Sequence, residues 1–176
     1  MKFFFGLGNP GSIYTGTRHN IGFDFIDYLA SKISEKQIKN DFNSITISYT
    51  NTKGEKIYLI KPQTYMNLSG NAVSEIKQFY KPDVQDIFIV FDDLDIEECK
   101  FKIQKGKYPK SHNGIKDIIA KCKTDQFNFI RIGIDGRSNI EKQFISGKDY
   151  VLSKYNREIF TRTFSDIINA LKEIII

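Results

Sequence analysis

The feature that most limits the possible folds of this chain is an unbroken run of five apolar residues, Ile87–Phe91. So short a run suits a strand, and it lacks the alternation of polar and apolar residues that marks a strand with one wet face. Strands of this kind usually belong to sheets that are covered by helices on both faces. The run therefore predicts an α/β protein with a central sheet between two helical layers.

Further periodic patterns predict the other elements. Short apolar or alternating segments predict strands at Phe3–Leu7, Ile45–Tyr49, Lys56–Ile60, Cys99–Ile103 and Phe129–Ile134. Apolar residues at helical spacing predict helices within residues 26–33, 72–80, 115–122 and 160–175, with Asn20 and Asn113 as N-caps of the first and third. Because strands alternate with helices around one hairpin, we expect a single α/β domain over residues 1–176. Its twisted mixed β-sheet would be flanked by helices.

The length and composition agree with one globular domain. The chain has 176 residues, of which 40% are hydrophobic and 27% are charged, and this balance excludes general disorder. Met1 leads into the apolar run Phe3–Phe5 without the basic region or cleavage site of a secretory signal. No apolar run approaches the roughly 18 residues of a membrane helix. We therefore expect a cytoplasmic protein with no membrane partner.

Positive charge is concentrated in one part of the chain. Residues 99–123 contain eight lysines and one acid, whereas the whole chain has a net charge of only +5. A local basic surface of this kind favours a partner that carries phosphate groups. The alternative is a solvated lysine-rich loop without a ligand.

Candidate general bases are few, because the chain has only two histidines, His19 and His112. Histidine is the side chain whose unperturbed pKa lies nearest neutrality. His19 precedes a predicted helix, so we expect it at the mouth of the sheet. Asp92 directly follows the run Ile87–Phe91, and sites in α/β sheets gather at the carboxyl ends of strands. A carboxylate there could hold one imidazole N–H and leave the other nitrogen free to accept a proton from water.

Three asparagines stand at comparable junctions between loops and predicted elements, namely Asn9, Asn67 and Asn113. A carboxamide donates and accepts hydrogen bonds without carrying charge. A cluster of such groups suits a peptide backbone and a developing oxyanion. Each asparagine alone is more often a turn or cap residue. The functional interpretation therefore depends on all three lying beside a histidine and an aspartate.

Two other kinds of site fit parts of the sequence. Gly6–Gly11 matches the Gly-x-Gly-x-x-Gly pattern of dinucleotide sites, but β-branched residues and another glycine follow it where that motif begins a helix. Asp92, Asp93 and Asp95 could bind Mg²⁺, although no phosphate-binding loop accompanies them. No Gly-x-Ser-x-Gly motif is present, which argues against a serine nucleophile. We therefore expect no metal and no nucleotide cofactor.

Six motifs occur in a fixed order along the chain. They are Gly-Leu-Gly-Asn-Pro-Gly, Tyr-x-x-x-Arg-His-Asn-x-Gly, Lys-Pro-Gln-Thr-Tyr-Met-Asn-x-Ser-Gly, Asp-Asp-x-Asp, His-Asn-Gly-x-Lys-Asp-Ile and Arg-Ile-Gly-Ile. In order and spacing, from residue 3 to about residue 155, this set resembles the bacterial-type peptidyl-tRNA hydrolase family. Single motifs are unspecific, but the complete set is highly specific.

The resemblance implies hydrolysis of the ester that joins a peptidyl group to the terminal ribose of tRNA, which frees the tRNA for reuse in translation. It implies that His19 is the general base for water and that Asp92 orients it. It further implies that Asn9, Asn67 and Asn113 hold the substrate and stabilise the tetrahedral oxyanion. Members of the family are generally monomers with a mixed sheet, and they use no metal or nucleotide cofactor.

The resemblance also implies contacts with the two parts of the substrate. Tyr14 and Met66 would line the channel for the peptide and the terminal adenosine, and His112 would be an ancillary site residue. The acceptor stem would lie along the basic window, with candidate contacts at Lys102, Lys105, Lys107, Lys110 and Arg131. Arg131 matches a basic position that contacts tRNA in relatives.

The chain departs from the family pattern in two places. Relatives have a glycine-rich run before the His-Asn-Gly motif, whereas this chain has the basic segment Lys107–Ser111 with a proline in it. Gln104 stands where relatives often carry a lysine, with Lys102 and Lys105 nearby. Two other functions stay open. One is an RNA-binding module without catalysis on the same scaffold, and the other is a metal-dependent phosphoesterase that uses Asp92 and Asp95.

Overall fold

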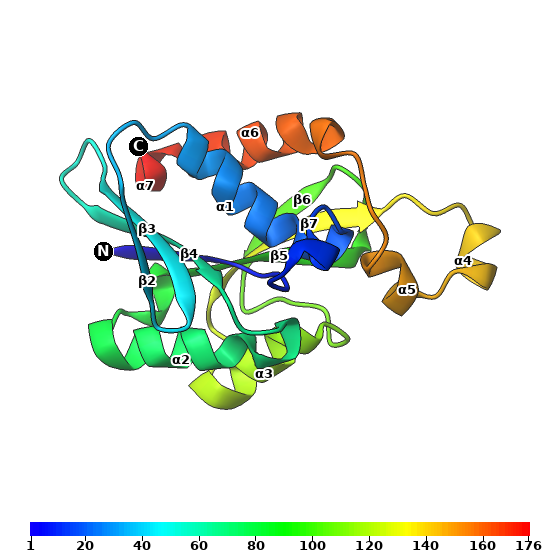
Figure 1. Cartoon of the computed structure of the whole chain (residues 1–176), viewed down its shortest axis with the longest axis horizontal. Helices are drawn as coiled ribbons and strands as arrows, with labels where there is room; N and C mark the ends of the chain where they lie inside the picture. Colours follow the sequence, from blue (N-terminus) through cyan, green and yellow to red (C-terminus); the bar gives the residue numbers. More distant parts are fainter.

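The apolar run Ile87–Phe91 lies inside a seven-stranded sheet in the computed structural model, which describes residues 1–176 (Figure 1). The strand order across the sheet is β2-β3-β4-β1-β5-β7-β6. Strands β1, β4, β5 and β7 are parallel, whereas β2, β3 and β6 are antiparallel to their neighbours. The strands are β1 (Lys2–Gly6), β2 (Gln37–Asp41), β3 (Ser44–Thr50), β4 (Lys56–Pro62), β5 (Ile87–Glu97), β6 (Phe101–Lys105) and β7 (Asn128–Asp135). The predicted mixed α/β sheet is thus confirmed.

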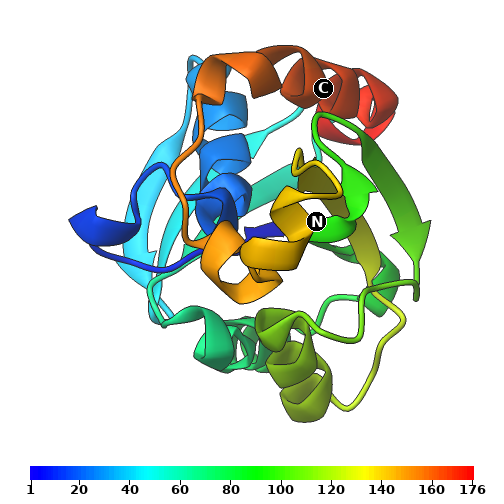
Figure 2. The same cartoon turned by 90° about the vertical axis from the view of Figure 1, so that its right-hand side faces the viewer.

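Helices cover both faces of this sheet (Figures 1 and 2). One face is covered by α1 (Ile21–Ser31), α6 (Thr161–Ala170) and α7 (Lys172–Ile175). The other is covered by α2 (Ser69–Tyr80) and α3 (Asn113–Cys122). The short helices α4 (Glu141–Phe144) and α5 (Gly147–Val151) project beyond one end of the sheet. Short 3-10 turns complete the chain at η1 (Ser12–Tyr14), η2 (Arg18–Asn20), η3 (Met66–Leu68), η4 (Val84–Asp86) and η5 (Arg157–Phe160).

The central strands are apolar throughout because each face of the sheet has its own core. Ile87, Ile89 and Phe91 of β5 pack with α2 and α3, while Phe88 and Val90 pack with α1 and α6. β1 divides in the same way, since successive side chains of a strand point to opposite faces. This arrangement accounts for an apolar run without alternation.

Several element boundaries differ from the sequence predictions. β5 does not end before Asp92 but continues to Glu97, because its backbone keeps pairing with β7 after β1 has ended. The predicted C-terminal helix is broken at Leu171 into α6 and α7. β2, α4 and α5 were not predicted. β2 carries almost only exposed side chains and so has no amphipathic signal.

The prediction of Asn113 as an N-cap was wrong, whereas Asn20 does hold the N-cap position of α1. Asn20 makes no side-chain cap with α1. The cap of α3 is His112, whose Nδ1 accepts a hydrogen bond from the backbone N–H of Ile115, and Asn113 is the first residue of the helix. A tertiary contact with Asn9, described below, takes the side chain of Asn20, and the ring of His112 caps α3 in place of Asn113. None of the helices has the length and apolar character that crossing a membrane requires.

Close packing of α1 against the end of β1 positions the loops at this end of the sheet. A Cβ on Gly22 would lie 2.5 Å from the backbone nitrogen and oxygen of Leu7 and 2.6 Å from the oxygen of Val90. A Cβ on Gly8 would lie 2.8 Å from the ring of Phe23. Only glycine allows such an approach. The loop after β1 and the turn η2 before α1 are thereby held together.

Candidate active site

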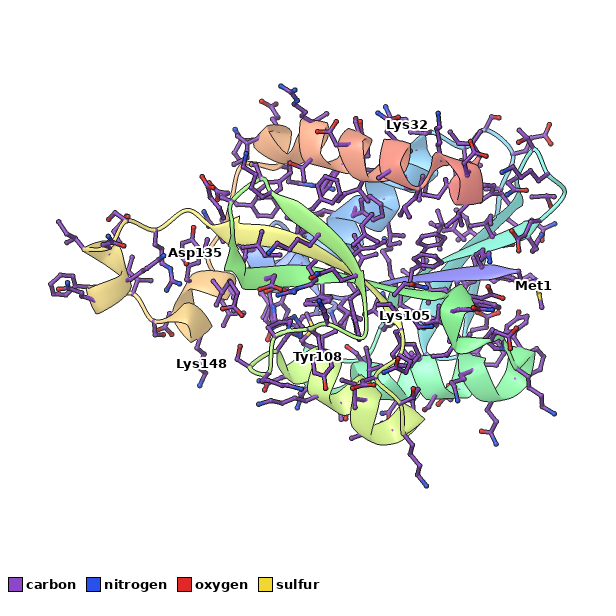
Figure 3. All side chains as sticks on the ribbon, turned by 180° about the vertical axis from the view of Figure 1, so that it is seen from behind. Met1, Lys32, Lys105, Tyr108, Asp135 and Lys148 are labelled. Atoms are coloured by element: carbon purple, nitrogen blue, oxygen red, sulfur yellow. The ribbon has the colours of Figure 1, made fainter.

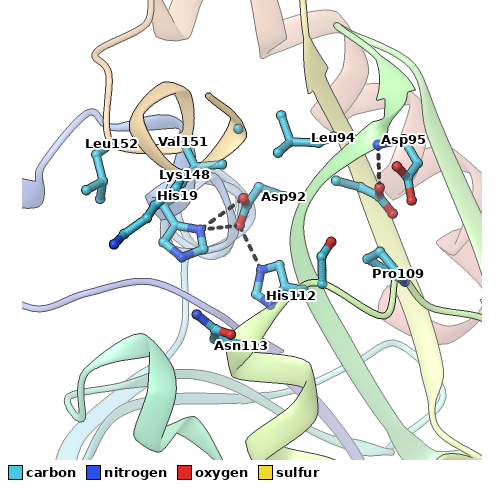
Figure 4. Close-up of a pocket in the computed structure, with 13 residues that line it drawn as sticks. His19, Asp92, Leu94, Asp95, Pro109, His112, Asn113, Lys148, Val151 and Leu152 are labelled. Carbon is cyan, nitrogen blue, oxygen red and sulfur yellow. Dashed lines mark hydrogen bonds and ion pairs between the residues drawn. The ribbon is translucent and has the colours of Figure 1, made fainter. Parts of the chain in front are cut away.

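The buried carboxylate of Asp92 is the centre of the site. Asp92 is 2% exposed and lies on β5, beyond the last residue of the neighbouring strand β1. Both histidines of the chain bind it, His19 from one side and His112 from the other (Figure 4). Burial alone would raise the pKa of Asp92, but the two imidazoles and their hydrogen bonds hold it well below its usual range. Asp92 is therefore ionised and accepts both bonds.

His19 uses only one of its ring nitrogens within the chain. Its Nδ1 lies 2.9 Å from each oxygen of Asp92, so Nδ1 carries the proton in the neutral ring and Nε2 keeps a free lone pair. Burial would lower the pKa of His19, but the charge of Asp92 and its hydrogen bond outweigh burial and raise the pKa above 6.5. The geometry is that of an oriented base.

His112 holds the opposite tautomer. Its Nδ1 accepts the backbone N–H of Ile115 at 3.3 Å, and its Nε2 lies 3.0 Å from Oδ1 of Asp92. Nε2 must therefore carry the proton and donate it. His112 thus connects the start of α3 to the same carboxylate that holds His19. A single side chain both caps the helix and fixes its position at the site.

Asn9 presents its side chain from the loop after β1. Its Oδ1 accepts the backbone N–H of Met66 at 2.8 Å, which leaves Nδ2 as the donor that the chain does not use. Met66 is buried and its sulfur would lie 2.7 Å from a Cβ on Gly114, so η3 packs directly on the start of α3. Asn9, Met66 and His112 therefore belong to one contiguous set of contacts.

Of the remaining predicted substrate residues, only Asn113 lines the cavity over the histidines. Asn113 lies beside His19 and His112 on the wall of the cavity, and its side chain is exposed (Figure 4). Asn67 is exposed on η3, next to Met66. The half-buried ring of Tyr14 meets the ring of Tyr65 edge-on, with centroids 6.3 Å apart. Tyr14 and Asn67 thus lie outside the lining of the cavity, on η1 and η3.

A cavity of about 440 Å³ opens directly over the two histidines. Its floor includes His19, Asp92 and Leu94, and the loop before α3 forms one wall. The opposite wall is α5, which contributes Lys148 and Val151 in a region where the sequence showed no motif (Figure 4). Arg18, beside His19, lies over the ring of Tyr150 in α5 at 4.2 Å and so ties this wall to the base. A cavity of this volume can admit a small part of a larger substrate.

The predicted basic residues lie along one edge of the molecule. Lys102 and Lys105 on the edge strand β6 are exposed, and so are Lys107 and Lys110 in the loop that follows. Figure 3 shows Lys105 and, in that loop, Tyr108. That loop is anchored by the packing of Tyr108 on Phe129 and by the burial of Pro109, which lines the cavity. The lysines thus lead from the sheet edge to the rim of the cavity.

Arg131 is placed differently from these lysines. Its Nε lies 2.7 Å from the buried carboxylate of Asp93, and its Nη1 donates to Oε1 of Gln104 at 2.9 Å. Most of its side chain is buried. Gln104, which stands where relatives often carry a lysine, is therefore a partner of Arg131 inside the protein.

The three aspartates that the sequence grouped as a possible Mg²⁺ site all line the cavity, but they do not form a converging set of metal ligands. Asp93 binds Arg131 and the backbone N–H of Asp95, away from Asp92. The only three potential metal ligands that converge are His19, Asp92 and His112, whose ligand atoms lie within 4.8 Å of one another. Both imidazoles already bind the carboxylate there, so a metal ion would have to displace these hydrogen bonds.

In this site an ionised carboxylate holds one nitrogen of an imidazole, and the other nitrogen faces a cavity. Hydrolytic enzymes use this arrangement to deprotonate a nucleophile. No serine binds this imidazole, so the nucleophile must come from the cavity. The molecule is thus of the class of hydrolases built on an α/β sheet.

Comparisons with known proteins define the family. The sequence model described as peptidyl-tRNA hydrolase matches residues 3–176. A peptidyl-tRNA hydrolase of Clostridium novyi is 37% identical, with 97% of this chain and 89% of the relative covered. One from Lacticaseibacillus casei is 45% identical over 76% of this chain and 72% of the relative. The crystal structure of peptidyl-tRNA hydrolase from Acinetobacter baumannii has a TM-score of 0.81 at 32% identity, with 99% of this chain and 86% of that chain covered. The chain belongs to the peptidyl-tRNA hydrolase family.

We expect Asp92→Asn to lower the pKa of His19. The amide keeps the shape of the carboxylate but removes the charge that outweighs burial, so the imidazole should titrate below 6.5 in the variant and above it in the parent. NMR titration of the ring protons measures both values, with the His19 signals assigned by their loss in His19→Asn. An unchanged pKa in the variant would show that Asp92 does not set the basicity of His19.

Proposed function

We propose that this protein hydrolyses peptidyl-tRNA at the ester between the peptidyl group and the terminal ribose, releasing a free peptide and a tRNA for reuse in translation. The observation that carries the proposal is the free Nε2 of His19, which Asp92 orients beneath a cavity through Nδ1. Membership in the family supplies the substrate class.

The proposed reaction needs no covalent intermediate on the enzyme. Nε2 of His19 takes a proton from water while the water oxygen bonds to the ester carbonyl carbon. The carbonyl oxygen becomes an oxyanion, which accepts hydrogen bonds from the neutral amide donors of Asn9 and Asn113. The bond from carbon to the ribose oxygen then breaks, and that oxygen takes the proton from His19. An ester has a better leaving group than an amide, so one oriented base and a few donors suffice.

We propose that the two parts of the substrate occupy the surfaces on either side of the cavity. Tyr14, Met66 and Asn67 contact the peptide and the terminal adenosine, and the exposed lysines follow the phosphates of the acceptor stem. Because Asp93 and Gln104 already bind Arg131, the lysines Lys102, Lys105, Lys107 and Lys110 provide the main phosphate contacts. We propose that the protein acts as a monomer, as members of the family generally do, in the cytoplasm where translation supplies the substrate.

We expect His19→Ala to lower the rate of peptide release by a factor of about 10² to 10⁴, the usual contribution of a general base. The affinity for tRNA should change little, because the imidazole contributes no charge to the phosphate surface. Release from N-acetyl-aminoacyl-tRNA gives the rate, and a filter-binding assay with deacylated tRNA gives the affinity. Both are measured with and without chelator.

These measurements separate the three possible functions. An RNA-binding module without catalysis would bind tRNA but leave the ester intact even in the parent protein. A metal-dependent phosphoesterase that used Asp92 and Asp95 would lose its activity in chelator. Full turnover by His19→Ala would show that another group is the base.

Replacing Lys105, Lys107 and Lys110 together by alanine should flatten the salt dependence of tRNA binding. Each lost phosphate contact reduces the slope of log affinity against log salt by about 0.7 to 0.9. The variant Lys32→Ala, Lys39→Ala, Lys172→Ala is the matched control. It removes the same charge from exposed sites just after α1, on β2 and on α7, at the end of the molecule opposite α5 (Figure 1). Equal slopes in the two triple variants would place the acceptor stem elsewhere.

A further inference from the structure

The backbone of Asn9 lies where the sheet no longer supplies hydrogen-bond partners. The last such bond of this segment runs from the N–H of Leu7 to the carbonyl of Val90 at 2.9 Å. Pro10 follows Asn9 and has no N–H, so the chain cannot continue the ladder there. Asn9 is nevertheless buried, so both its N–H and its carbonyl need partners inside the protein.

The side chain of Asn20 supplies both partners. Its Oδ1 accepts the N–H of Asn9 at 2.8 Å, and its Nδ2 donates to the carbonyl of Asn9 at 2.9 Å. Asn20 is 4% exposed. The reciprocal pair permits only one orientation of the amide, because the opposite orientation would place donor against donor and acceptor against acceptor. This pairing explains why the side chain of Asn20 makes no cap hydrogen bond with α1.

The pairing also determines what the side chain of Asn9 can do. With its backbone held by Asn20 and its Oδ1 bound to the N–H of Met66, the carboxamide of Asn9 has a fixed direction. Nδ2 is then a preorganised donor. Preorganised donors stabilise a developing oxyanion because they need no rearrangement during the reaction.

Asn20 directly follows His19 in the same 3-10 turn, η2. One residue of the turn is bound to Asp92, and the next is bound to Asn9. The close contact of Gly22 with Leu7 holds this turn against the loop of Asn9. The turn therefore fixes the base and the amide donor relative to each other.

We propose that Asn20 is a positioning residue for hydrolysis, holding the Asn9 carboxamide as an oxyanion donor at a fixed place relative to His19. The inference rests on the proposed function, in which Asn9 stabilises the oxyanion. Asn20 acts only through Asn9 and does not touch the substrate.

A double-mutant cycle tests this role. We expect Asn9→Ala to lower kcat about 100-fold, the usual effect of removing one oxyanion donor. Asn20→Ala should lower kcat at least about tenfold, with a much smaller effect on KM. In the double variant, the loss should stay within about threefold of Asn9→Ala alone, because Asn20 then has no donor to position. If the two effects multiply to about 1000-fold, Asn20 does not act through Asn9.

Two further measurements separate positioning from general destabilisation. The pH at which the rate falls on the acid side of the profile reports the pKa of His19. This pH should be the same in Asn20→Ala as in the parent. Asn51→Ala is the matched control. Asn51, like Asn20, is a buried asparagine, and it lies in the hairpin far from the cavity. Its Oδ1 accepts two backbone N–H groups. It should lower the melting temperature as Asn20→Ala does but leave kcat unchanged.

A second variant keeps the test open if Asn20→Ala does not fold. Asn20→Asp has the same shape and keeps the acceptor for the N–H of Asn9, but it sets a carboxylate oxygen against the Asn9 carbonyl. It should also lower kcat at least about tenfold. A parent-like kcat in either Asn20 variant would overturn the proposal while leaving the hydrolase function intact. No ester cleavage by the parent protein would instead overturn the proposed function.

Discussion

The structure of the site depends on one buried carboxylate that two imidazoles share. Asp92 is almost fully removed from solvent, and its charge is stable there only because His19 and His112 both donate to it. His19 brings the start of α1 to this point, and His112 brings the start of α3 from the other face of the sheet. One ion thus joins the two helical layers at the place where β1 ends. The same interaction orients the base and raises its proton affinity.

Neutral amides surround this charged centre, and the spacing of the sequence motifs follows from how they are held. Asn9, Asn20 and the backbone of Met66 form a set of hydrogen bonds that joins three loops. Glycines stand where these loops meet α1 and α3, since side chains at Gly22 and Gly114 would collide with Leu7 and Met66. The glycines near the asparagines in the motifs are therefore needed for the close approach of the elements. The hydrogen bonds of the asparagines then hold the loops in that arrangement.

Much of this arrangement could be predicted from the sequence, because periodicity reports burial. The continuous apolar run of β5 and the helical spacing in α1, α2 and α3 led directly to the layered α/β fold. The grouping of His19, Asp92, Asn9 and Asn113 followed from their positions at element ends and from the resemblance. The roles of Asn20 and His112 could not be predicted in this way, because their partners are brought near only by tertiary packing. Local preference suggested caps at Asn20 and Asn113, whereas contacts with Asn9 and Asp92 decide the actual arrangement. The wall formed by α5 gave no signal either, since its residues have no periodicity long enough to detect.

The central claim is that Asp92 holds the two histidines in opposite tautomers, so that His19 alone offers a free Nε2 to the cavity. Nitrogen-15 NMR of the imidazole rings, at a pH well above the acid inflection of the rate, measures which nitrogen of each ring carries the proton. We predict a protonated Nδ1 and a bare Nε2 for His19, and the reverse for His112. A proton on Nε2 of His19 under these conditions would contradict the assignment of His19 as the base that activates water.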